Sequence, residues 1–239
     1  MDNNMSVFSK VATWIILLGA SVASLSAQFD QLRYRVEGGA VASRVSGIGH
    51  PADPFLLGFR LSGQVVFPFK YSNFALQTGL TLTNKGEKSN FYIEDKTEGY
   101  SGGRFTLSES SSLAFMYLSL PLEVSYRLNL NPNNRIYLAV GPSFNYGLVG
   151  TINDLKAPGV KKSYDVFGQN LFKRFEVSLG ANAMYEYRRF YIKAGAEYGL
   201  TTIDSEHKKL TLTDRYAVSP FAQDHARHAL VYLTLGYQF

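Results

Sequence analysis

Residues 207–228 contain the side chain types that nucleophilic catalysis requires. A serine, a histidine and an aspartate that meet in space can act as nucleophile, base and orienting carboxylate. The candidates are His207, Asp214, Ser219, Asp224, His225 and His228. No motif fixes their spacing, and polar loops commonly hold such residues. We therefore expect no catalytic residues and no enzyme activity, and we keep a lipid-modifying enzyme that uses His225 or His228 as an alternative.

The sequence offers no cofactor, metal or nucleic-acid site either. His225 and His228 lack the i, i+4 spacing of helical metal ligands, and the chain has no cysteine. No glycine-rich phosphate loop lies between a strand and a helix. The formal net charge of +5 comes from scattered lysines and arginines rather than from a basic run. We expect no cofactor, no metal and no nucleic-acid partner.

A second set of charged residues lies in segments where apolar and polar residues alternate. In 112–128, for example, Leu118, Leu120 and Leu122 alternate with Ser119, Pro121 and Glu123. Successive side chains of a strand point to opposite faces, so this pattern predicts a strand with one apolar face. The same pattern occurs in 34–43, 55–69, 74–83, 135–148, 173–187, 190–200 and 227–239.

The connections between these predicted strands alternate between short and long. Short connections lie at 70–73, 129–134 and 188–189, and longer ones at 46–54, 84–111, 150–170 and 201–226. Transmembrane barrels have an even number of strands, short periplasmic turns and long outer loops. The sequence therefore predicts an all-β fold, a closed antiparallel eight-stranded transmembrane β-barrel of the outer-membrane type. Within the long connection 84–111, the segment 90–95 could pair with the segment 103–108 and extend the barrel wall.

Aromatic residues are expected to form girdles at both membrane interfaces. The predicted lower girdle consists of Phe67, Phe69, Phe74, Tyr126, Tyr187, Phe190, Tyr237 and Phe239. The predicted upper girdle consists of Phe55, Phe115, Phe144, Tyr146 and Tyr198.

The polar faces of the predicted strands carry charges of both signs. The inward set is Arg35, Glu37, Arg60, Glu123, Arg127, Arg174, Glu176, Glu186, Lys193 and Glu197. An eight-stranded barrel is just wide enough for side chains to fill it, and buried charges must be paired. We predict an ion-pair network that plugs the lumen. A small-solute channel and a soluble periplasmic barrel with an internal ligand are the alternatives.

The two ends of the chain suggest export and membrane insertion. Residues 1–27 have the basic, apolar and small-residue regions of a signal peptide, with cleavage near Ala27. The barrel domain then spans 28–239, and we expect it to be integral to the cell outer membrane. Tyr237 and Phe239 end the chain on the apolar face of its last strand.

Four segments resemble the PorT-like family of outer-membrane β-barrel proteins. They are YLSLPLEVSYRL, YLAVGPSFNYGL, FEVSLGANAMYEYRRFYIKAGAEYGLTTI and LTLGYQF, and the likeness runs from about residue 33 to the end. The resemblance implies a barrel type without shared catalytic residues. The terminal Tyr237 and Phe239 resemble the signal read by the barrel assembly machinery. The expected partners are outer-membrane lipid, that machinery, and a protein bound at the outer loops or the periplasmic face.

Overall fold

The computed structural model describes residues 31–46, 55–95, 105–153, 163–204, 210–211, 216–218 and 225–239. The predicted signal peptide, residues 1–27, lies outside this part. The long strands are β1 (Arg33–Ser46), β2 (Leu56–Pro68), β3 (Phe74–Asp95), β4 (Phe105–Asn131), β5 (Asn134–Asn153), β7 (Phe175–Tyr187), β8 (Phe190–Gly199) and β11 (Arg227–Gln238). The short strands are β6 (Ser163–Asp165), β9 (Leu210–Thr211) and β10 (Tyr216–Val218).

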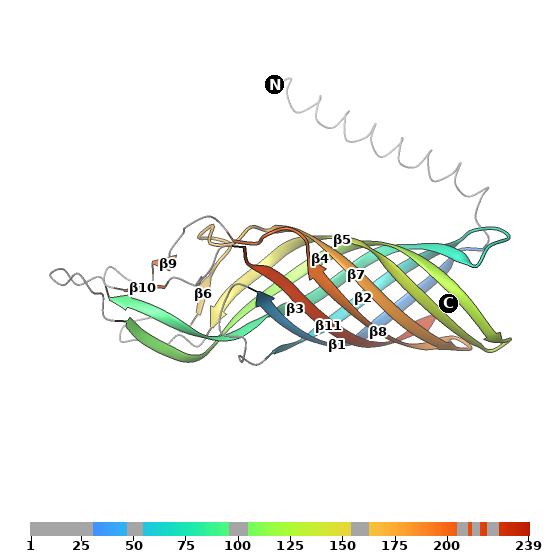
Figure 1. Ribbon diagram of the computed structural model, residues 1–239, viewed down its shortest axis with the longest axis horizontal. Helices are drawn as coiled ribbons and strands as arrows, with labels where there is room; N and C mark the ends of the chain where they lie inside the picture. The colour runs from blue at the N-terminus through green and yellow to red at the C-terminus, as the bar shows by residue number, and fades with distance from the viewer. Residues whose placement is uncertain are drawn as a thin grey trace, which may run out of the picture.

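The eight long strands form one closed antiparallel ring (Figure 1). Each pairs with its neighbour along the chain, and β11 returns to pair with β1 from Arg35–Gln238 to Ser46–Arg227. The pairing of β2 with β3 completes the ring. The predicted closed eight-stranded barrel is therefore confirmed. Within the described residues, no helix is long and apolar enough to cross a bilayer.

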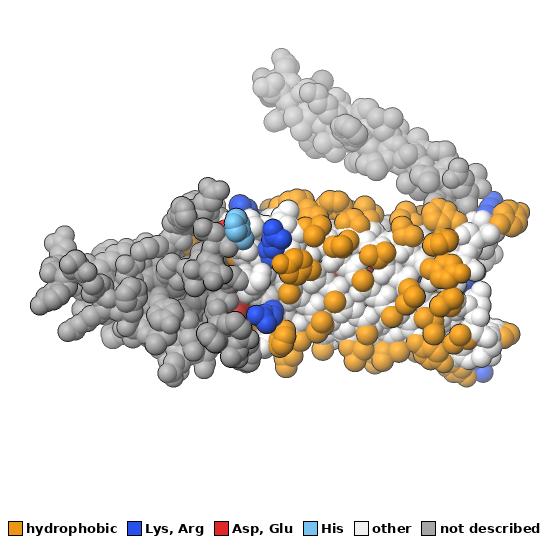
Figure 2. Space-filling model, viewed as in Figure 1, with side chains coloured by type: hydrophobic (Ala, Val, Ile, Leu, Met, Phe, Trp, Pro, Cys, Tyr) orange, Lys and Arg blue, Asp and Glu red, His pale blue; other side chains and the backbone are white. Residues whose placement is uncertain are grey.

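The alternation of residue types sorts the side chains between the two faces of the wall. On β7, Glu176 and Ser178 are buried inside the ring, whereas Phe175 and Leu179 are exposed on the outside. Exposed large hydrophobic residues occur on every long strand, and Figure 2 shows hydrophobic side chains over the described part of the face in view. A soluble protein rarely leaves so large an apolar surface in water. The apolar faces therefore meet lipid, and the soluble periplasmic alternative does not fit this arrangement.

The ring has two unlike ends. The short turns and the C-terminus lie at one end, here called the turn end, and the short strands β6, β9 and β10 lie at the other, here called the loop end (Figure 1). The tight turns contain Tyr71 and Arg188, whose φ angles of 59° and 57° are in the left-handed region. This sorting matches the periplasmic and outer ends of transmembrane barrels.

The connection predicted at 84–111 is shorter in the structure. Residues 84–95 continue β3, and β4 begins at Phe105, so most of the predicted loop 84–111 is strand. The expected pairing between its two halves is confirmed, from Phe91–Ser108 to Glu94–Phe105. Strand β10 adds to the outer part of β3, and β9 pairs with β10. A β-hairpin therefore extends the barrel wall beyond the loop end.

Gly79 lets two strands approach closely on the inner side of the wall. A Cβ atom at this position would collide with the carbonyl oxygen of Gly63 and would lie 2.7 Å from the Cα of Gln64. In contrast, a Cβ atom at Gly63 would have no neighbour within 4 Å. The two glycines lie in β3 and β2, so one barrel supplies both a test position and a matched control.

We predict that Gly79→Ala destabilises the barrel by about 1–3 kcal/mol, because the methyl group overpacks the wall. The fraction of the chain that migrates as the compact, unboiled form on a denaturing gel should fall for this variant. Gly63→Ala should leave that fraction unchanged. Equal compact fractions for the two variants would show that the close approach at Gly79 does not matter.

Candidate functional site: the filled lumen

The loop-end level of the lumen is built on one carboxylate. The Lys85 Nζ donates to Glu176 Oε2 at 2.7 Å, and His228 Nδ1 lies 3.1 Å from the same oxygen. All three side chains are buried. The Lys85 Nζ also lies 4.4 Å from the ring centroid of Tyr117, and the His228 ring meets the Phe115 ring edge-on with centroids 5.2 Å apart. Glu176 therefore lies between two basic groups and beside two aromatic rings.

The middle level contains two ion pairs. The Arg60 Nη1 lies 2.8 Å from Glu197 Oε1, and the Lys193 Nζ lies 2.6 Å from Glu37 Oε2. The Arg60 guanidinium also stacks over the Tyr232 ring at 4.3 Å from its centroid. Each charge taken out of water costs several kcal/mol, and a close partner of opposite sign offsets that cost. The ion pairs join β8 to β2 and to β1, strands that are not direct neighbours in the ring.

Neutral polar groups complete the middle level. The Asn182 side-chain amide donates to Glu123 Oε1 at 3.1 Å. The hydroxyl groups of Ser62 and Thr81 lie 2.8 Å apart, within hydrogen-bonding distance. These bonds satisfy polar atoms that would otherwise be buried without partners.

The turn-end level is centred on Glu186. The Arg135 Nη1 donates to Glu186 Oε1 at 2.7 Å, and the Arg35 Nη2 lies 3.6 Å from the other carboxylate oxygen. The Arg35 Nε donates to Gln238 Oε1 at 2.9 Å, and its guanidinium lies 4.6 Å from the centroid of the Tyr137 ring. The bond to Gln238 ties the first long strand to the last inside the lumen.

Two predicted members of the network lie apart from these levels. Arg174 precedes β7 and donates to the carbonyl oxygens of Gly147 and Leu148 at 3.0 and 3.2 Å. Within the described residues Arg174 makes no ion pair, and its guanidinium lies 4.8 Å from the centroid of the Phe167 ring. Arg127 points inward at the turn end, beside a polar pocket of about 290 Å³ at the β2–β3 turn. Within the described ranges it also makes no ion pair.

Lys85, Arg135 and His228 belong to the network although the sequence did not single them out as members. Lys85 was assigned to a loop, yet it continues the inward series Thr81 and Thr83 along β3. That alternation was the available signal.

An apolar cluster fills the mouth of the barrel at the loop end. Its members are Val45, Leu113, Phe115, Tyr117, Ile152, Tyr164, Val166, Phe167, Leu171, Phe172, Ile203 and Ala226. The connection between β6 and β7 turns into the mouth, where Val166 donates a backbone hydrogen bond to Gly150 at 2.9 Å. Phe115 belongs to this cluster with 0% exposure, so its assignment to the outer girdle was wrong. It shares the inward face of β4 with Tyr117.

The catalytic candidates do not come together in the part of the chain that is described. His207, Asp214, Ser219 and Asp224 lie outside it. His228 is buried against Glu176, as described above, whereas His225 is exposed and has a φ of 82°. Among the described residues, no group of three or more His, Cys, Asp or Glu side chains could hold a metal ion.

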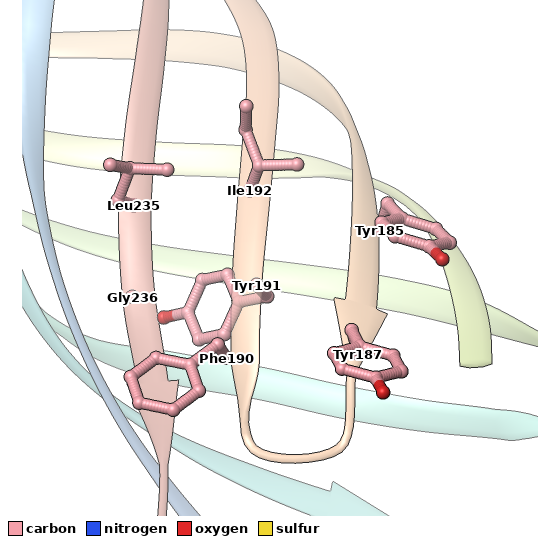
Figure 3. A pocket seen from close by; sticks show the side chains of 7 residues that line it. All are labelled: Tyr185, Tyr187, Phe190, Tyr191, Ile192, Leu235 and Gly236. Carbon is pink, nitrogen blue, oxygen red and sulfur yellow. The ribbon is translucent and has the colours of Figure 1, made fainter. Parts of the chain in front are cut away.

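Aromatic side chains line the outside of the wall at the turn end. A shallow groove of about 280 Å³ lies between β7, β8 and β11. Figure 3 shows the side chains that line it, among them Tyr185, Tyr187 and Phe190. At the end of β11, Tyr237 packs between two aromatic rings, with its centroid 5.2 Å from that of Phe190 and 5.0 Å from that of Phe239.

Tyr237 also holds the turn between β7 and β8. The Arg189 guanidinium donates to its hydroxyl oxygen at 3.2 Å, and this hydrogen bond raises the pKa of Arg189 above its ordinary value.

We predict that Glu176→Gln lowers the free energy of unfolding by about 3–5 kcal/mol, because it leaves the ammonium group of Lys85 buried without its carboxylate. Denaturant titration of the protein in detergent measures this loss. Lys85→Met combined with Glu176→Gln should recover part of it, since no buried cation then remains at this position.

The control for this prediction is Lys88→Gln, which changes an exposed lysine near the same end and should alter stability by no more than about 0.5 kcal/mol. A Glu176→Gln variant that unfolds at the same denaturant concentration as the control would contradict the proposed support of the barrel by this level.

Comparison with known proteins found similar solved structures and one matching family. Three solved structures are similar to it. Ail, the attachment invasion locus protein of Yersinia pestis, has a TM-score of 0.45 and 16% identity over 88% of this chain and 100% of that one. Neisserial surface protein A has a TM-score of 0.44 and 10% identity over 88% and 100%. A major outer membrane protein of Thermus thermophilus has a TM-score of 0.44 and 16% identity over 88% and 100%.

No curated protein matches the chain. Residues 26–205, well over half of the sequence, match the family described as outer membrane protein beta-barrel domain. This match agrees with the closed ring, the apolar outer wall and the charged interior. The chain belongs to the outer membrane protein β-barrel domain family, and its place is the outer membrane.

Proposed function

We propose that this protein is a non-enzymatic outer-membrane barrel with a plugged lumen, and that it acts through contacts made at its loop end. The observation that carries the proposal is the filled interior, in which three levels of ion pairs lie beneath an apolar cluster. Such an interior supports a rigid membrane anchor rather than a path for solutes or a reaction chamber.

The lumen is too narrow and too fully occupied by side chains to form a path for solutes. An eight-stranded ring leaves room for side chains but not for a water-filled channel. The pairs Arg60–Glu197 and Lys193–Glu37 cross the middle level, and Phe115 lies in the cluster above. A moving ion would have to break pairs that are buried and hydrogen-bonded, which costs several kcal/mol for each charge exposed.

We expect the purified protein to produce no stepwise conductance in planar bilayers, because these pairs block the lumen. The measurement is a single-channel recording of the folded protein, identified by the change in its gel mobility on boiling. A general porin in the same type of bilayer serves as the positive control. Reproducible conductance steps from the folded protein would replace this proposal with the alternative of a small-solute channel.

The extended β3–β4 hairpin supports a role in binding a protein partner. Residues 105–111 of β4 pair with β3 on one side. Pairing with β5 begins only at Ser112, so within the described residues the other edge of this segment has no strand beside it. A strand edge with unpaired backbone groups can accept a further strand from another chain. This geometry supports the proposal of a partner at the outer loops.

We predict that a single cysteine at Ser108 forms a discrete cross-linked adduct on intact cells, since this position lies on the extended part of β4. The chain has no native cysteine, so the introduced thiol is unique. The measurement is a gel shift after treatment with a membrane-impermeant thiol-reactive photo-cross-linker. Asn133→Cys in the β4–β5 turn is the control, because the reagent does not reach the periplasm. If the Ser108→Cys variant reacts with the cross-linker but forms no adduct with another protein, the result would contradict the proposal.

We further propose that the protein belongs to the PorT-like branch of the family, that a signal peptide exports it, and that its terminal aromatic residues are recognised during assembly. The PorT-like branch rests on the four resembling segments, and export rests on the predicted signal peptide. A role for Tyr237 and Phe239 in recognition by the barrel assembly machinery is supported by their outward positions at the end of β11. Nothing in the described residues favours the lipid-modifying alternative, since His228 is held by Glu176 beneath the apolar cluster.

A further inference from the structure

A groove on the lipid-facing wall lies near the loop end, on the outside of the barrel. Its volume is about 500 Å³, within the range of about 300–1,000 Å³ that is usual for ligand sites. Ala181, Ala196 and Ala229 form its floor, and the larger side chains of Tyr198 and Val231 form its sides. The small residues of neighbouring strands therefore leave a depression between bulkier ones.

The groove has a positive charge at its outer border. Arg44 belongs to its lining, on the outward face of β1. The Arg44 guanidinium lies 6.0 Å from the centroid of the Phe55 ring, and within the described residues it makes no hydrogen bond or ion pair. Arginine normally uses its planar set of donors to hold a carboxylate or a phosphate. The five donors of Arg44 are thus available to a ligand.

A second arginine lies beside Arg44. Arg44 pairs across the strands with Ala229, and Arg227 precedes Ala229 by two positions, so Arg227 lies on the same face. Diagonal neighbours of this kind are about 7–8 Å apart, a distance that long side chains can span. The Arg227 Nε is buried and has no hydrogen-bond partner among the described residues.

The depth of the two arginines matches the headgroup region. Ala229 pairs with Tyr198, and Tyr198 pairs with Leu179, so Arg44 lies on the level of an exposed aromatic residue of the upper girdle. Figure 2 shows basic side chains at the loop-end border of the hydrophobic band. Aromatic belts mark the interface between hydrocarbon and headgroups. Ala196 pairs with Val231, two positions farther from the loop end than Ala229, so this part of the floor lies toward the hydrocarbon while Arg44 lies at the level of the headgroups.

We propose that this groove is a binding site for an anionic lipid of the outer leaflet, with the lipid phosphate held by Arg44 and Arg227 and one acyl chain lying over Ala181 and Ala196. Charge complementarity selects the phosphate, because Arg44 borders the groove with its donors unused and Arg227 lies beside it on the same face of the wall. The alanine floor lets the chain contact the wall on both sides. The inference is independent of the proposed function, which concerns the lumen and the loop end.

The test compares two lipids that have the same acyl chains. The purified protein in detergent is incubated with equal amounts of dipalmitoylphosphatidylglycerol and dipalmitoylphosphatidylcholine, and native mass spectrometry measures which adducts are retained. We expect the anionic lipid to be retained about tenfold more than the zwitterionic one. Equal retention of the two lipids by the wild-type chain would overturn the proposal.

Variants separate the phosphate contacts from the groove. Arg44→Gln combined with Arg227→Gln should abolish the preference for the anionic lipid, whereas Lys88→Gln, which removes an exposed cation elsewhere near the loop end, should keep it. Ala196→Leu fills the floor and should lower the retention of both lipids. The migration shift on boiling confirms folding of each variant. A preference that survives loss of both arginines, or a filled groove that retains lipid as before, would overturn the site.

Discussion

The structure depends on one constraint: backbone N–H and C=O groups within the hydrocarbon of a membrane need partners from the protein itself. A ring of eight strands meets this constraint only when the last strand pairs with the first, as β11 pairs with β1 over twelve registered positions from Arg35–Gln238 to Ser46–Arg227. Once the ring is closed, one face of every strand must meet lipid and the other must fill a narrow interior. The alternation of residue types, the aromatic girdles and the buried charges all follow from this division.

The interior shows how charge can be placed in a confined space. Each level couples at least one carboxylate to a basic group from another strand, and aromatic rings cover the cations: Tyr117 covers Lys85, Tyr232 covers Arg60 and Tyr137 covers Arg35. Cation–π contacts contribute more when the cation is removed from water. The inner tyrosines therefore stabilise the buried cations in place of water, and their rings fill the space between the charged side chains.

Much of this arrangement could be predicted from the sequence because period-two alternation is a strong signal in strands that separate lipid from a polar interior. The ring, the number of long strands and the inward positions of most charges followed from it. Lys85 was missed because it lies in a segment whose charge and glycine content suggested a loop. Phe115 was assigned to the wrong face because an aromatic residue near the membrane border fits equally well in an outer girdle and in an apolar cluster inside the mouth. Only its position in the alternation along β4, on the same face as Tyr117, distinguishes the two.

Arg174 illustrates a different limit of such reasoning. It lies one residue before β7 begins at Phe175, where the chain leaves the plugged mouth and enters the wall. By alternation Arg174 points inward as Glu176 does, yet its guanidinium donates to the carbonyl oxygens of Gly147 and Leu148 and packs on the Phe167 ring instead of meeting a described carboxylate. The pairs formed inside the ring could not be derived either, because the pairing of residues across the lumen depends on the stagger of strands far apart in sequence.

The contacts made by β11 have a consequence for closure of the barrel. His228 completes the environment of Glu176, and Gln238 accepts a hydrogen bond from Arg35, so β11 supplies partners for buried groups that stand on other strands. A sheet that lacks this strand has an open seam and incompletely satisfied polar groups, and neither can enter hydrocarbon cheaply. Closing the seam between β11 and β1 therefore completes the backbone pairing of the wall and the polar contacts of the lumen together.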